Sequence, residues 1–209
     1  MSNFRRRLMM SIKKEEKYTQ LEYIEKNGFT QYINTGLIPQ PDWTYEFDFE
    51  RIGNFNYLCG SDKGYKEGSF NISIDLTNFA GLRTLNFGTL FNNSGITPPI
   101  NKRMIITKKP NQFIIGTNTY KIDKGNIKAE YPLVIFTTNR KGTPQVSSIF
   151  TQQYKLYSFK ITDENGNLIQ KLLPALDKNG VVGMYDTVTK EFYTNQGTGE
   201  FIAGPKVED

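Results

Sequence analysis

The sequence of 209 residues contains no histidine, one cysteine and one tryptophan. Without histidine the chain cannot build a Ser-His-Asp or Cys-His nucleophilic site, a histidine-ligated zinc centre or imidazole acid–base chemistry. The single cysteine, Cys59, excludes a disulfide within the chain, and its place in a strand-like run predicts a buried, inert thiol. An enzyme built from this sequence would therefore depend on carboxylates, lysine or tyrosine.

Long apolar segments are also missing. No stretch approaches the roughly 20 apolar residues that a membrane-spanning helix needs, and no apolar core of a secretory signal follows the charged N-terminus. We therefore expect no membrane span, and synthesis in a cytoplasm. No cofactor and no metal site is predicted, and no D-x-D-x-D loop of the kind that binds calcium is present.

Positive charge is concentrated at the N-terminus. The chain has a net charge of +5, and residues 1–17 hold six basic and two acidic side chains, which give +4 of it. The remaining 192 residues carry only +1. The domain itself is therefore close to neutral and lacks the broad basic field of a nucleic-acid-binding protein.

Residues 2–16 are the one good helix candidate, because apolar side chains recur there every four residues. Such a helix is too short to be stable alone in water, so it needs a surface to lie against. We expect residues 1–17 to be an arm that docks onto a partner protein; contact with packaged DNA or with an anionic membrane surface are the alternatives. The docking residues expected are Phe4, Arg5, Arg6, Arg7, Leu8 and Ile12.

From Tyr18 onward the pattern is one of short strands separated by turns, with no helix between them. It predicts an antiparallel two-sheet sandwich over residues 18–204, followed by a loose tail at 205–209. Lys26–Phe29 reads as a hairpin turn, and Asn165-Gly166 favours a type I′ turn. The expected strands are Thr19–Glu25, Thr30–Thr35, Trp43–Glu50, Phe70–Thr77, Arg103–Thr107, Gln112–Ile115, Thr119–Asp123, Pro132–Phe136, Gln153–Thr162, Asn167–Leu173, Val181–Asp186 and Glu191–Thr194.

Two terminal motifs carry a family resemblance. The opening runs Leu21–Glu25 and Thr30–Gly36, with the closing runs Gly183–Asp186, Glu191–Asn195 and Gly197–Phe201, resemble laminin-G-like, concanavalin A-like jelly-roll domains. The resemblance covers residues 19–204 and implies that fold. Such domains are abundant in phages of gut bacteria, and the N-terminal run Asn3–Met10 is similar to the N-termini of short proteins from Bacteroidales phages, including the crAss-like group.

The resemblance implies a bacteriophage virion protein without catalytic residues, such as a head fibre or a capsid or tail decoration. It would be assembled in the bacterial host cytoplasm, lie on the virion surface, dock through its arm to capsid, portal or fibre proteins, and form a dimer or trimer. Host or mucosal glycans are the expected ligand, and a capsid cement without ligand is a further alternative. Loops at a sandwich rim often hold binding residues; the carbohydrate-binding candidates are Tyr65, Asn92, Asn93, Asn139 and Arg140.

The competing enzymatic interpretation rests on Glu46-Phe47-Asp48-Phe49-Glu50. This run resembles the E-x-D-x-E strand of laminarinase-type glycoside hydrolases, which implies Glu46 as nucleophile, Asp48 as assistant and Glu50 as general acid/base. Alternate residues on a strand lie about 6.7 Å apart, so the two glutamates are separated by about 13 Å at Cα. Retaining hydrolysis needs carboxyl groups within about 5.5 Å. We therefore expect the outer face of a half-buried strand, with the acids opposite lysines of a neighbour.

Overall fold

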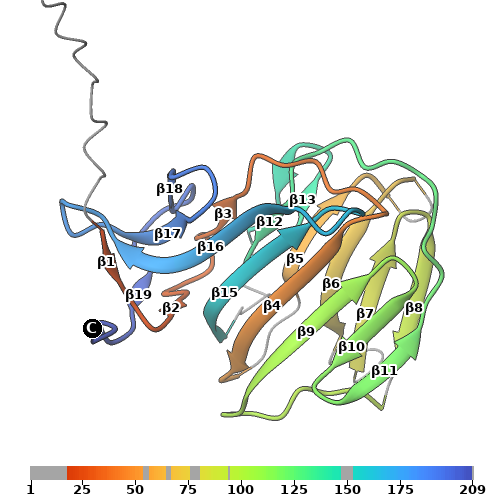
Figure 1. Ribbon diagram of the computed structural model, residues 1–209, viewed down its shortest axis with the longest axis horizontal. Coiled ribbons are helices and arrows are strands. Elements are labelled where there is room, and N and C mark those ends of the chain that lie inside the picture. Colours follow the sequence, from red (N-terminus) through yellow and green to blue (C-terminus); the bar gives the residue numbers. More distant parts are fainter. Residues whose placement is uncertain are drawn as a thin grey trace, which may run out of the picture.

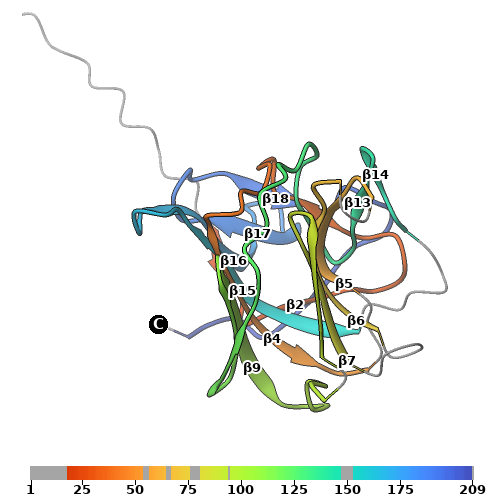
Figure 2. The ribbon, with the colours of Figure 1, turned by 90° about the vertical axis from the view of Figure 1, so that its right-hand side faces the viewer.

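The computed structural model describes residues 18–53, 57–64, 67–75, 81–93, 95–146 and 153–208. Within these residues the protein is all-β, and two sheets pack face to face. Figure 2 shows the two layers from the side, with β4, β9 and β15 in one and β5, β6 and β7 in the other. The all-β class and the two-sheet sandwich predicted from the sequence are confirmed. The predicted N-terminal helix lies outside the described residues.

The larger sheet is antiparallel and follows the order β11-β10-β9-β4-β15-β16-β17-β18, with β1, β2 and β19 attached at its side. Its strands β9, β10 and β11 form the meander that the sequence predicted. The strands are β1 (Thr19–Gln20), β2 (Ile24–Glu25), β4 (Thr44–Arg51), β9 (Arg103–Lys109), β10 (Gln112–Ile115), β11 (Asn118–Lys121), β15 (Tyr154–Thr162), β16 (Leu168–Leu176), β17 (Val182–Asp186), β18 (Phe192–Thr194) and β19 (Ile202–Ala203).

The smaller sheet follows the order β14-β13-β5-β6-β7-β8, and β12 joins β5 to β3. Its pairs are antiparallel except for β13 with β5, which run parallel. The strands are β3 (Ile33–Asn34), β5 (Tyr57–Asp62), β6 (Phe70–Asp75), β7 (Gly81–Asn86), β8 (Thr89–Asn93), β12 (Val134–Ile135), β13 (Asn139–Arg140) and β14 (Thr143–Pro144).

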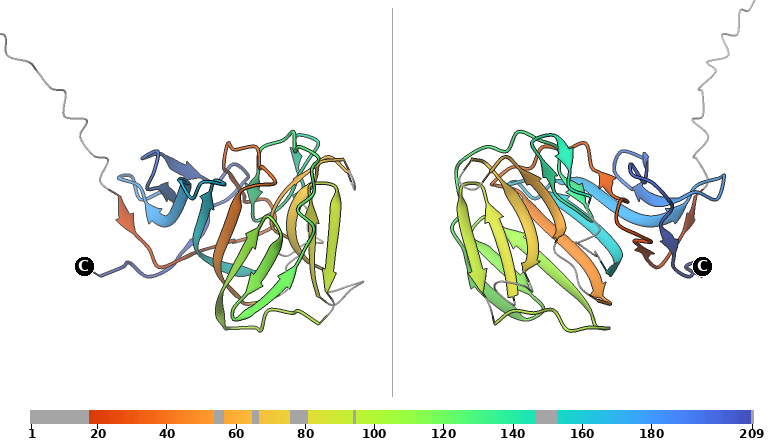
Figure 3. Two further views of the ribbon diagram at one scale, coloured as in Figure 1. Left: turned by 45° about the vertical axis from the view of Figure 1, so that its right-hand side comes forward. Right: turned by 180° about the vertical axis from the view of Figure 1, so that it is seen from behind.

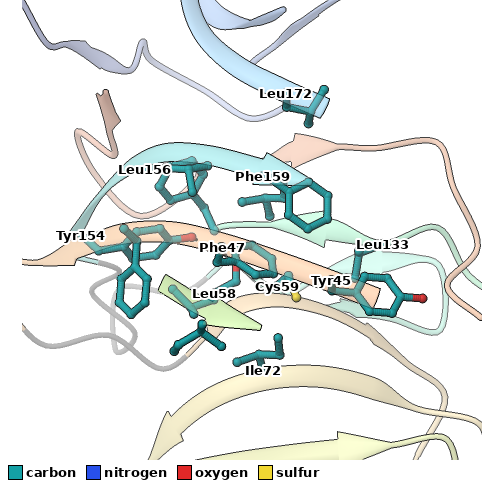
Figure 4. Close-up of a cluster of buried hydrophobic side chains, with 14 of the residues drawn as sticks. Tyr45, Phe47, Leu58, Cys59, Ile72, Leu133, Tyr154, Leu156, Phe159 and Leu172 are labelled. Atoms are coloured by element: carbon teal, nitrogen blue, oxygen red, sulfur yellow. Dashed lines mark hydrogen bonds between the residues drawn. The ribbon is translucent and has the colours of Figure 1, made fainter. Parts of the chain in front are cut away.

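Aromatic side chains fill the space between the sheets (Figure 4). Along β4 every second residue is buried, so Tyr45, Phe47 and Phe49 face the core. Phe47 packs against Phe159 of β15 with ring centroids 4.5 Å apart. The Tyr154 hydroxyl donates a hydrogen bond of 3.0 Å to the carbonyl of Leu58, which ties the larger sheet to the smaller one. Each buried aromatic residue removes a large apolar area from water, so this layer is the main source of stability.

The hairpin expected between residues 19–25 and 30–35 is wrong. Strand β2 pairs with β15 and β19 in the larger sheet, whereas β3 pairs with β12 in the smaller one. The segment between β2 and β3 therefore leaves one sheet for the other. Alternation along a chain predicts that a strand exists, but the partner depends on contacts with residues far away in the sequence.

The hairpin of β15 and β16 is confirmed, but its turn is not of type I′. A type I′ turn needs positive φ at both central residues, and here only Gly166 has one, at 85°. The Asp163 carboxylate instead accepts hydrogen bonds from the backbone N–H groups of Asn165 and Asn167, at 2.9 and 2.7 Å. A bulge at Ile161/Thr162 completes this longer loop.

Strands β16, β17 and β18 extend beyond the two-layer part, and β1 and β19 lie beside them (Figures 1 and 3). Residues 20–22 lie beside residues 205–207 here, because Glu22 N–H donates to the carbonyl of Pro205, and Val207 N–H to that of Gln20. Residues 205–207 are thus held by backbone hydrogen bonds, in contrast to the loose tail expected. In the part of the chain described, no helix has the length and apolarity needed to cross a membrane.

Candidate functional site

A polar groove of about 410 Å³ lies on the outer face of the smaller sheet. Strand β6 supplies its floor because its residues alternate, with Phe70 and Ile72 in the core and Asn71 and Ser73 on the outer side. Both outer residues are nevertheless buried, at 3% and 7% exposure. Polar side chains on the outer face of a sheet are normally exposed, so their burial indicates a real depression. The groove is lined by Tyr57, Asp62, Lys63, Gly64, Glu67, Asn71, Ser73, Arg83, Leu85, Arg140 and Lys141.

Hydrogen bonds to neighbouring strands hold the floor in place. The Asn71 Oδ1 atom accepts a hydrogen bond of 3.2 Å from the backbone N–H of Leu85, and the Ser73 hydroxyl donates one of 3.0 Å to the carbonyl of Arg83. The Asn71 Nδ2 group donates no hydrogen bond within the described residues. This amide group is therefore available to donate to water or to a ligand in the groove.

The parallel pairing of β5 with β13 builds one wall of the groove, because its register sets Arg140 opposite Asp62. Arg140 donates from Nε to Asp62 Oδ2 at 3.2 Å. The other oxygen, Oδ1, accepts from the backbone N–H of Gly64 at 2.9 Å and from the Ser69 hydroxyl at 2.6 Å. Lys141 and Gly142 have φ values of 52° and 85°, which a type I′ turn requires, and so return the chain from β13 to β14.

A second ion pair stands beside this wall. Lys63 binds the Glu130 carboxylate, and this hydrogen bond holds the pKa of the Lys63 ammonium above its usual value. Both side chains are exposed to a large extent, so the pair contributes little to stability. The groove thus carries fixed charges of both signs at its rim above a neutral polar floor. Such a lining suits a ligand rich in hydroxyl groups and charges rather than an apolar one.

The structure separates the residues predicted to bind carbohydrate. Arg140 lines the groove. Asn139 is buried behind it and donates from Nδ2 to the carbonyl of Pro132 at 3.0 Å. Asn92 is exposed on β8 opposite Arg83, and Asn93 accepts a hydrogen bond from Gly95 N–H in the next turn. Neither Asn92 nor Asn93 belongs to the groove lining, and Tyr65 lies outside the described residues.

Sequence reasoning missed most of the groove. Asn71 and Ser73 were detectable, because the alternation of β6 places them on the face opposite Phe70 and Ile72. Asp62 has no such signal, because it is a single acid without a periodic pattern around it. Tyr57 and Arg83 were also missed, and they enter the groove because strand pairing aligns Tyr57 with Ser73 and Ser73 with Arg83.

The three acids of β4 lie on the outer face of the larger sheet, each paired with a cation of a neighbouring strand. Asp48 accepts two hydrogen bonds from Arg103, at 2.8 and 2.7 Å. Glu46 pairs with Lys160 at 2.9 Å, and Glu50 with Lys155 at 3.1 Å.

Glu50 is held as a carboxylate. Burial disfavours its charge, but hydrogen bonds from Lys155 and from the Tyr157 hydroxyl outweigh this and keep the pKa of the Glu50 carboxyl below its usual value. A glycosidase general acid needs the opposite, a raised pKa that keeps the proton available near neutral pH. The arrangement is therefore that of a surface ion-pair network, and it lacks the feature that acid catalysis by Glu50 would require.

The sequence matches no protein-family model and no curated protein. Among the described residues, no group of three or more Cys, Asp or Glu side chains is arranged to hold a metal ion. The docking residues predicted at the N-terminus, Phe4, Arg5, Arg6, Arg7, Leu8 and Ile12, lie outside the described residues.

The two terminal motifs that carry the laminin-G-like resemblance lie against each other. Gln31 donates from Nε2 to the carbonyl of Glu200 at 3.2 Å, and Tyr32 N–H donates to Asn195 Oδ1 at 3.1 Å. Gly197 is required by this contact, because a Cβ atom there would lie 1.8 Å from the carbonyl oxygen of Thr30. The opening and closing motifs are thus two halves of one structural unit.

Proposed function

We propose that this chain is a non-enzymatic surface protein of a bacteriophage particle, a laminin-G-like jelly-roll sandwich that binds a glycan of the host cell or of mucus. The observation that carries the binding part of the proposal is the polar groove on the smaller sheet. Its floor holds the Asn71 amide group, which donates no hydrogen bond within the described residues, and its wall holds an ion-paired arginine. Convergent polar groups in a preformed depression are what a hydroxyl-rich ligand needs.

The phage assignment is supported by the sequence resemblance. The basic arm of residues 1–17 supplies attachment in this proposal, and oligomerisation would strengthen weak glycan contacts through effective concentration.

Glycan binding is tested with the purified full-length protein on a printed array of host-surface and mucosal oligosaccharides, followed by calorimetry on the glycans that bind. The variant Tyr57→Ala/Asn71→Ala alters the groove floor, and we expect it to lose more than about tenfold in affinity. Asn118→Ala, which changes an exposed residue of β11 away from the groove, is the matched control and should bind as the wild type does. Absence of binding to every glycan would overturn this part of the proposal.

Attachment is tested by deleting residues 1–12 and reconstituting particles. We expect the shortened protein to keep its thermal unfolding transition but to be missing from purified particles. Normal incorporation of the shortened protein would contradict the docking role of the arm.

A further inference from the structure

We propose that the groove selects glycans that carry a carboxylate, and that Arg140 binds this group. The inference rests on the proposed function, because it names the class of glycan that the same groove would take. It depends on three features of the described residues: the charge of the lining, the way Arg140 is held and the donors that remain free beside it.

The lining has more cationic than anionic side chains. Lys63, Arg83, Arg140 and Lys141 stand against Asp62 and Glu67. The residues after position 17 are nearly neutral in total, so this excess of positive charge is a local property of the groove. Glu130, which pairs with Lys63, reduces this excess but leaves a net positive charge. A net positive groove on a nearly neutral body raises the local concentration of anionic ligands.

Asp62 offers a ligand no free acceptor. Its side chain is 6% exposed, and both oxygens already accept hydrogen bonds, one from Arg140 and the other from Gly64 and Ser69. Its carboxylate faces the protein, where it orients the guanidinium of Arg140. Asp62 is thus a positioning residue for Arg140 rather than a contact for the ligand.

Arg140 is both exposed and held. Its side chain is 55% exposed, and it donates to Asp62 through Nε. In the part of the chain that the structure describes, its terminal Nη atoms donate no hydrogen bond. A guanidinium fixed at Nε presents these remaining N–H groups as a planar fork, whose geometry matches the two oxygens of a carboxylate. The fixed orientation also reduces the side-chain entropy lost on binding.

The Asn71 amide adds a donor on the floor of the same groove. Its Oδ1 atom is engaged by Leu85, which orients the side chain and leaves Nδ2 as the free donor. Arg140 and Asn71 thus both present N–H donors, and such a pair favours a ligand that offers acceptors, as an acidic sugar does. A nucleic acid is the less suitable polyanion, because the groove is a short depression of about 410 Å³ rather than a track along a charged surface.

The test uses the full-length protein and a printed array of neutral oligosaccharides and of oligosaccharides that contain uronic or sialic acid. The acidic glycans that bind are then reduced chemically, which converts the carboxylate to a hydroxymethyl group and leaves the rest of the sugar unchanged. We expect the bound set to be dominated by acidic glycans, and reduction to weaken binding by about tenfold to a hundredfold, the loss typical of a charge-assisted hydrogen bond pair.

Two variants assign the effect to Arg140. Arg140→Gln removes the positive charge and should remove the difference in affinity between acidic and reduced glycans. Arg140→Lys keeps the charge and the fold but loses the planar fork, and should retain only part of the difference. Lys121→Gln, an exposed cation of β11 outside the groove, is the charge-matched control and should keep the full preference. Thermal unfolding of each variant verifies that it is folded.

Three unfavourable outcomes of these binding experiments lead to different conclusions. If the protein binds neutral and reduced glycans as tightly as acidic ones, the carboxylate inference is overturned and the glycan-binding function stands. If a single-stranded DNA 20-mer binds as tightly as the acidic glycans and displaces them, the groove is a general polyanion site and the inference is also overturned. If no glycan binds, both proposals fail.

Discussion

The guanidinium of Arg103 donates two hydrogen bonds to the carboxylate of Asp48 and lies 3.9 Å over the ring of Tyr157. This contact joins β9 to β4 on the outer face of the larger sheet, at the centre of the Glu46-Phe47-Asp48-Phe49-Glu50 run. The acid that a laminarinase-type mechanism would use as an assistant is therefore part of an arginine pair.

From this arrangement we expect no glycosidase activity. Wild-type protein and Glu46→Gln, incubated with β-glucans, should both release no reducing sugar above a no-protein blank. The Glu46→Gln substitution should also change the free energy of unfolding by no more than about 1 kcal/mol, because it breaks a partly exposed ion pair. Release of reducing sugar by the wild type, lost in Glu46→Gln, would instead support the hydrolase interpretation.

A buried lysine makes stability depend on pH. Lys108 of β9 is fully buried, and its ammonium nitrogen lies 3.2 Å from the carbonyl of Pro41 and 5.0 Å from the ring centre of Phe87. Burial lowers the pKa of Lys108 from 10.5 to about 7. Asp42 raises this pKa and Lys124 lowers it, both by smaller amounts. Between these values the unfolded chain binds more protons than the folded one, so stability should rise as the pH is raised from about 7 to 10.

The substitution Lys108→Met removes the contribution of Lys108 to this pH dependence. Lys26, whose pKa burial lowers to about 8, makes stability rise with pH in the same direction and remains in the variant. We expect the variant to be more stable than the wild type at pH 7, by an amount on the order of a few kcal/mol, and to show a smaller pH slope. Denaturant unfolding across pH 6–10 measures both quantities. Lys109→Met, at the exposed neighbouring position, should leave the slope unchanged; an unchanged slope in Lys108→Met would contradict the assignment.

The thiol of Cys59 should be unreactive in the folded protein. It is fully buried between the sheets, and burial raises the pKa of the thiol far above its usual value, so almost no thiolate forms. Ellman's reagent should label less than a tenth of the protein in buffer on the time scale of minutes and all of it in guanidinium chloride. Rapid labelling of folded protein would show that the two layers open readily.

Two glycines test the packing of the loops. Gly125 has a φ of 70°, and a Cβ atom there would lie 2.2 Å from the carbonyl oxygen of Asn86. Gly166 has a φ of 85° but open space around it. Gly166→Ala should cost roughly 1–2 kcal/mol of unfolding free energy, from backbone strain alone. Gly125→Ala should cost at least twice as much, because the backbone of β7 must also shift; equal costs in denaturant unfolding would contradict the contact.

The all-β class and many of the strands follow from local patterns in the sequence. Trp43–Glu50 predicted β4 because strict alternation of aromatic and acidic residues has the period of a strand and of no helix. The same period placed Tyr45, Phe47 and Phe49 in the core. The meander of β9, β10 and β11 and the hairpin of β15 and β16 were also predictable, since neighbouring strands joined by short turns pair with each other.

Which distant segments meet is visible in the folded protein and not in any local pattern. Strands β2 and β3 join different sheets, although both are short runs of similar composition close together in the chain. The groove has the same origin: Asp62 and Arg140 face each other because β13 lies parallel to β5, and no local periodicity encodes that register. Local steric and hydrophobic preferences act over a few residues, whereas pairing across the chain is settled by which arrangement buries the shared core and satisfies the backbone.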